Sequence, residues 1–138
     1  MKTRKIISWV ARVAAAVILL QTLFFKFTGA PESIYIFETL GIESFGRIGS
    51  GIIELIAGVL LLINRTKVWG ALIALVTMAC AILSHLLILG VDVNGDGGGL
   101  FAMALVVFFS ALTILFYTKK NYHFLMPLIL LALLNSKN

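Results

Sequence analysis

The feature that most constrains the fold is a series of four long apolar runs. They cover residues 6–27, 47–63, 68–89 and 100–117, and neither of the two prolines falls inside any of them. A helix that crosses a hydrocarbon layer about 30 Å thick needs roughly 17–25 apolar residues. The chain is 61% hydrophobic and only 12% charged, whereas soluble domains carry about 25% charged residues. We therefore predict an all-α integral membrane protein, a four-helix transmembrane bundle formed by residues 1–118.

The distribution of lysine and arginine predicts the orientation of this bundle. Basic residues precede the first run, separate the second from the third and follow the fourth, while the other two connections are acidic. Positive charge on alternate loops marks the cytoplasmic side, so we predict a cytoplasmic N terminus. Because the net charge of +5 follows from these clusters, we expect no nucleic-acid partner. The basic residues in question are Lys2, Arg4, Lys5, Arg65, Lys67, Lys119 and Lys120.

The first run also has features of a secretory signal peptide, with a basic start and a conceivable cleavage site at residues 28–30. Its length, and Arg12 inside it, are atypical of a signal peptide. We expect the run to remain as the first span.

The stretch VDVNGDGGG at residues 91–99 contains Asp92-Val93-Asn94-Gly95-Asp96-Gly97, which matches the opening of an EF-hand calcium loop. An EF-hand also needs a bidentate glutamate at loop position twelve, and Met103 occupies that position here. Glycine permits tight turns, and aspartate and asparagine hydrogen-bond locally within them. We therefore predict a polar turn on the outer side, with Asp96 capping the fourth span.

Four ionisable residues in or beside the apolar runs fall at a similar depth under the predicted topology. Lys26 lies near the outer end of the first span, and Glu54 lies about 10 Å below Arg47 in the second. His85 lies about one turn before the outer end of the third span. Charges within a span are costly and often mark functional sites. Lys26, Arg47, Glu54 and His85 are therefore our candidate ligand-binding residues.

Two interpretations of these four residues stay open. In the first, Glu54 pairs with Lys26 or Arg47, His85 hydrogen-bonds to Glu54, and the network only fixes helix register. In the second, the same groups line a pocket that binds a head group or relays protons. We expect no metal site, because zinc is usually held by four protein ligands and the other histidine, His123, is predicted on the opposite side.

Small residues share helix faces with these charges. On the second span, Arg47, Gly51, Glu54 and Gly58 follow the spacing of a single helical stripe. Small residues allow close approach of helices in lipid, so we expect this stripe to face the other spans. The facing stripes are Arg12, Ala15, Leu19, Thr22 and Lys26 on the first span, and Thr77, Ala81 and Ser84 on the third.

Two segments remain outside the four spans. Residues 30–45 carry Ile34, Phe37 and Leu40 at helical spacing between glutamates, which predicts a short amphipathic helix on the outer surface. Residues 119–138 form an apolar tail whose uniformly apolar stretch of about 13 residues is short for a span. We favour an interfacial helix there, and a short fifth span is the alternative.

Several of these residues together resemble the DoxX family of small four-span membrane proteins. The resemblance covers roughly residues 6–118 and rests on Arg12, Phe24-Phe25-Lys26-Phe27, Glu54 with Gly58, His85, and Asp96-Gly97-Gly98 leading into Leu100-Phe101. The family takes its name from the small membrane subunit of a thiosulfate:quinone oxidoreductase. Some related folds act in thiol oxidation through cysteine pairs, and Cys80 alone does not match that chemistry.

The resemblance implies a protein of the bacterial cytoplasmic (inner) membrane that supports a quinone-linked redox process. A quinone would then be the cofactor or ligand, and a soluble redox protein the partner. The sequence contains no haem, flavin or iron–sulfur signature of its own, which argues against an enzyme acting in isolation. The alternative is a non-enzymatic protein that binds a lipid or small amphiphile, or that assembles partners.

Overall fold

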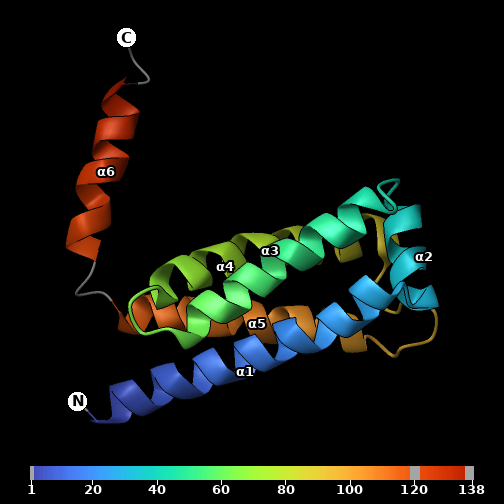
Figure 1. The fold of residues 1–138 in the computed structure, drawn as a ribbon, viewed down its shortest axis with the longest axis horizontal. Helices are drawn as coiled ribbons and strands as arrows, with labels where there is room; N and C mark the ends of the chain where they lie inside the picture. Colours follow the sequence, from blue (N-terminus) through green and yellow to red (C-terminus); the bar gives the residue numbers. More distant parts are fainter. Residues whose placement is uncertain (1, 119–121, 136–138) are drawn as a thin grey trace.

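The computed structural model describes residues 2–118 and 122–135, and within them every regular element is a helix (Figure 1). The predicted cytoplasmic residues Lys119 and Lys120 lie outside the described residues. The helices are α1 (Lys2–Thr28), α2 (Pro31–Thr39), α3 (Phe45–Leu62), α4 (Lys67–Ser84), the π-helical turn η1 (His85–Leu89), α5 (Gly99–Tyr117) and α6 (Tyr122–Asn135).

Four helices form the predicted bundle. α1 packs against α3 and α5, and α4 packs against the same two helices, so the four close into a ring. Each of α1, α3, α4 with η1, and α5 is long and apolar enough to cross a membrane. The four predicted spans are thus confirmed as helices, and their ends lie at the predicted residues or within a few residues of them.

The centre of the ring is filled by small and branched apolar side chains. Leu19, Leu61, Val107 and Ile114 are the largest fully buried side chains, and alanines from all four helices pack around them. Other apolar side chains, such as Phe24, Val76 and Phe109, point outward and are exposed. An apolar exterior is what a hydrocarbon environment favours, so this is an integral membrane protein in structure as well as in composition.

Close approach of α3 and α4 depends on one glycine that the sequence analysis did not single out. A Cβ added to Gly70 would lie 2.7 Å from the backbone nitrogen of Leu61 and 2.9 Å from the carbonyl oxygen of Ala57. Gly58, on the predicted stripe, similarly faces Leu20 and the carbonyl of Ala16 on α1. The stripe does face the first span, as expected.

Arg12 holds the end of α3. Its Nε donates to the carbonyl of Leu61 at 2.6 Å, and its two terminal nitrogens donate to Leu62 and to the side chain of Asn64. The last carbonyls of a helix have no partner within the helix, and in lipid an unpaired carbonyl is costly. Arg12, only 3% exposed and stacked beside Trp9, satisfies them from the neighbouring helix.

The predicted outer helix exists as α2 and crosses the end of the bundle (Figure 1). Ser33 and Phe37 are its buried residues. At the chain's other extreme, α6 is a helix of 14 residues with Pro127 inside it, and its described side chains are exposed. At roughly 21 Å it is short for a span, so an interfacial position remains our prediction for it.

Candidate functional site

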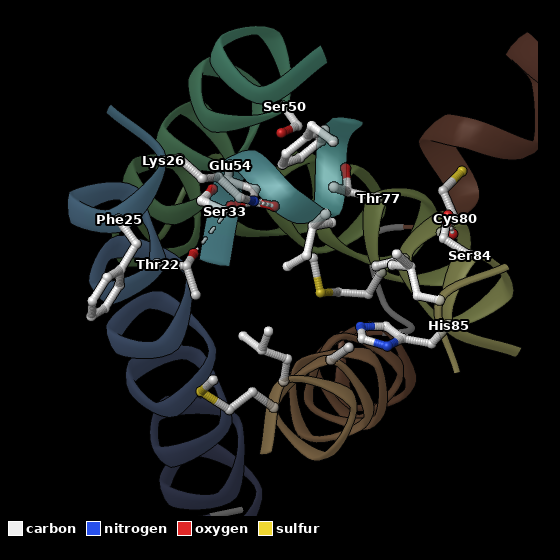
Figure 2. A pocket seen from close by; sticks show the side chains of 18 of the residues that line it. Thr22, Phe25, Lys26, Ser33, Ser50, Glu54, Thr77, Cys80, Ser84 and His85 are labelled. Atoms are coloured by element: carbon white, nitrogen blue, oxygen red, sulfur yellow. Dashed lines mark hydrogen bonds and ion pairs between the residues drawn. The ribbon is translucent and has the colours of Figure 1, made fainter. Parts of the chain in front are cut away.

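A cavity of about 520 Å³ occupies the α2 end of the bundle. All four spanning helices contribute to its walls, and α2 contributes Glu32, Ser33, Ile36, Phe37 and Leu40. Most of the lining is apolar, from residues such as Ile18, Met78 and Met103. Figure 2 shows the polar side chains gathered mainly in two places, around Lys26 and around His85, on opposite sides of the space. A largely apolar cleft with a few convergent polar groups is typical of a small-molecule site.

Lys26 and Glu54 form an ion pair in one wall. The ammonium nitrogen Nζ of Lys26 lies 2.5 Å from Oε1 of Glu54, and the hydroxyl of Thr22 lies 3.2 Å from the other carboxylate oxygen. The Glu54 side chain is only 5% exposed and that of Lys26 16%. The ring of Phe37, from α2, lies 5.9 Å from the ammonium. The predicted pairing of Glu54 with Lys26 is therefore present, and α2 covers it.

Arg47 is not part of this ion pair, although it belongs to the same stripe of α3. Its Nε donates to Oε1 of Glu43 at 2.7 Å, and one terminal nitrogen donates to the backbone carbonyl of Lys26. Arg47 is also absent from the cavity lining. Arg47 ties the start of α3 to the end of α1 through the Lys26 carbonyl, and its ion-pair partner is Glu43, one turn earlier.

His85 lies across the cavity, where α4 changes into the π-helical turn η1. The carbonyl of Gly90 lies 2.9 Å from Nδ1 of His85, and the ring of Phe101 packs edge-on against the imidazole. The expected hydrogen bond from His85 to Glu54 is not formed, because Nδ1 is taken by Gly90 and the two side chains lie on opposite walls (Figure 2). π-helical turns often occur at functional sites, and periodicity alone gave no sign of this one.

The polar turn after η1 is organised by Asp96. Its Oδ1 accepts hydrogen bonds from the backbone N–H groups of Val93 and Gly98, and its Oδ2 accepts one from Leu100 in the first turn of α5. The predicted capping of the fourth span is therefore confirmed. These carboxylate oxygens serve the backbone, as a turn requires.

The same contacts set the pKa of Asp96. Partial burial raises this pKa, but hydrogen bonds from the backbone N–H groups of Gly98, Leu100 and Val93 lower it by more. The net pKa of Asp96 lies below the ordinary value. The carboxylate is therefore held in its charged form at neutral pH.

Two contributors to this region were not predicted as site residues by the sequence analysis. Thr22 was noted only as part of a stripe, and Ser33 was not singled out. Helical spacing places both on inward faces, but nothing in the pattern indicates a hydroxyl beside an ion pair. Among the described residues, no group of three or more His, Cys, Asp or Glu side chains is placed to hold a metal ion.

Comparison with protein-family models gives a match to DoxX over residues 7–87, more than half of the chain. The chain belongs to the DoxX family. Within this DoxX protein, the matched segment includes the Lys26–Glu54 pair and His85, but neither the Asp96 turn nor α5. Searches of curated proteins and of solved structures gave no match.

Proposed function

We propose that this DoxX-family protein binds the head group of a quinone in the cavity at the α2 end. It would act there as a membrane subunit of a quinone-linked redox process in the bacterial inner membrane. The observation that carries the proposal is the cavity itself. Its volume of about 520 Å³, its apolar walls and its two opposed polar groups fit a small aromatic ring with an oxygen at each end.

The position of the cavity supports the same function. It lies among membrane-spanning helices, so a ligand with an apolar tail reaches it from the bilayer. The protein's own residues would position the ring and hold protons at its oxygens, while a soluble redox partner would supply the electrons. Under the positive-inside prediction this end of the bundle faces outward, which places such a partner outside the cytoplasm.

Quinone co-purification tests the proposal directly. The protein is purified in mild detergent, extracted with organic solvent, and the extract is analysed by mass spectrometry against an empty-membrane preparation. We expect a quinone in near-stoichiometric amount. Ala81→Phe places a ring in the cavity wall and should remove the quinone, whereas Ala102→Phe, on an exposed position of α5 outside the cavity, should not.

The outcome also separates the proposed function from its alternative. A phospholipid retained in place of quinone, and displaced by Ala81→Phe, would support a lipid-binding or assembly role. Retention of neither ligand would leave the quinone proposal without support. Both variants are first compared with the unmodified protein by thermal unfolding, so that loss of ligand is not mistaken for loss of fold.

A further inference from the structure

The hydroxyl groups in the cavity differ in what they offer to a ligand. Four of them already use their single proton on a carbonyl of their own helix, so only oxygen lone pairs face the space. Hydroxyls of this kind accept hydrogen bonds but do not donate them. The four hydrogen bonds run from the hydroxyl of Thr22 to the carbonyl of Leu19 at 2.8 Å, from Ser50 to Arg47 at 3.1 Å, from Thr77 to Ile73 at 2.7 Å and from Ser84 to Cys80 at 2.8 Å.

Ser33 is the exception. It lies in the first turns of α2, is 6% exposed and lines the cavity. Its hydroxyl makes no hydrogen bond to any of the described residues, although buried polar groups normally have a partner. Figure 2 shows Ser33 beside the Lys26–Glu54 pair. The lysine ammonium has three donors and spends one on Glu54, so donors are concentrated at this end of the cavity.

The opposite end offers an acceptor. Nδ1 of His85 faces the carbonyl oxygen of Gly90, and a carbonyl can only accept, so Nδ1 carries the proton. In the neutral ring Nε2 is then left with a lone pair. Ser84 lies on the same side, and its hydroxyl proton is already donated to the carbonyl of Cys80. The remaining polar lining residues add no buried donor: Gln21, Glu32 and Cys80 are exposed, and the carboxylate of Asp96 accepts from backbone N–H groups.

From this arrangement we infer that the cavity prefers the reduced, hydroxyl-bearing form of its ligand, a quinol, over the oxidised quinone. This inference rests on the proposed function and specifies the redox form that the site binds. One hydroxyl oxygen of the quinol accepts from Lys26 and Ser33, and its own O–H donates to the lone pairs of Thr22 on the same side. The oxygen at the other end donates its O–H to Nε2 of His85. A quinone has two carbonyl oxygens, which only accept, so it leaves Nε2 unpaired in a desolvated site.

The experiment is anaerobic titration calorimetry of the detergent-solubilised protein with decylubiquinol and with decylubiquinone. An unpaired polar group costs enough that we expect about tenfold tighter binding of the quinol. The dimethyl ether of the same quinol keeps both oxygens but lacks the O–H groups, and it should bind no better than the quinone. That third ligand distinguishes hydrogen-bond donation from redox state.

Two variants test which residues produce the preference for quinol. His85→Phe should abolish the preference, because the quinol loses its acceptor and the quinone no longer leaves Nε2 unpaired. Ser33→Ala should weaken both forms by a similar factor, and Ser44→Ala, at an exposed serine outside the cavity, should change neither. The ratio of quinol affinity to quinone affinity in the unmodified protein tests the inference by itself, even where a variant folds poorly.

The possible results separate the two proposals. Equal affinities, or tighter binding of the quinone, would overturn the preference for quinol and leave the proposed quinone site intact. Binding of neither form would overturn both.

Discussion

Lys26 is held at both its side chain and its backbone. Glu54 binds the ammonium group, while Arg47 binds the carbonyl of the same residue. The ion pair is almost completely buried on the Glu54 side. Removing one member of a buried pair strands the other charge and typically costs about 3–5 kcal/mol. Replacing both members by neutral groups of similar size removes this penalty.

A double-mutant comparison therefore measures what the pair contributes to folding. Glu54→Gln should lower the free energy of unfolding by about 3 kcal/mol, and Lys26→Met combined with Glu54→Gln should recover most of that loss. Unfolding is followed by circular dichroism in a series of sodium dodecyl sulfate mixtures. The matched control is Glu38→Gln, at an exposed glutamate of α2. A double variant no more stable than the weaker single variant would contradict a simple ion pair.

At the scale of single helices, contact between α3 and α4 is limited by backbone atoms. The space above Gly70 is bounded by the nitrogen of Leu61 and the carbonyl oxygen of Ala57. Unlike the end of a flexible side chain, these atoms cannot move without shifting a helix. Helix pairs in membranes gain stability from such close approach.

Gly70→Ala should therefore push α3 and α4 apart and destabilise the protein by about 1–3 kcal/mol, the usual range for overpacking. Gly49→Ala is the matched control, because a Cβ at Gly49 meets nothing within 4 Å. That change should be neutral or slightly stabilising, since alanine favours helix. Thermal unfolding of the two variants in one detergent gives the comparison, and equal midpoints would refute the argument.

The helices were more predictable than their polar partners. Runs of apolar residues fix spans because a bilayer imposes one length, and the acidic turn at Asp96 was predictable because capping is local in sequence. The hydrogen-bond partners of Arg12, Arg47 and His85 could not be predicted from the sequence. Arg12 and Arg47 bind backbone carbonyls of other segments. Because every residue has a backbone carbonyl, the residue types do not indicate which one will accept the hydrogen bond. His85 lies in a π-helical turn, which shifts side-chain directions that the α-helical period predicts.

At the scale of the whole molecule, the packing of the described helices does not indicate which end of the bundle faces the cytoplasm, so the orientation needs a separate sign. The charge distribution supplies one: α2 and the Asp96 turn lie at the acidic end, and the α3–α4 connection lies at the opposite, basic end (Figure 1). Positive charge is retained on the cytoplasmic side.

Reporter fusions should show this orientation. Fusions after Lys67 and after Lys120 should be active as cytoplasmic green fluorescent protein and inactive as alkaline phosphatase. A fusion near Gly95 should show the reverse. Phosphatase activity at Lys67 would invert the topology and place the cavity at the cytoplasmic face.

The partners of α1 have a consequence for biosynthesis. Both Arg12 and Lys26 are satisfied by α3, through the carbonyls of Leu61 and Leu62 and the carboxylate of Glu54. α1 is synthesised before α3, so both cations meet the insertion machinery before their partners have been translated. A helix carrying two uncompensated charges gains little by moving into lipid alone. α1 should thus remain beside the insertion machinery until α3 emerges, and the two helices should enter the bilayer as a pair.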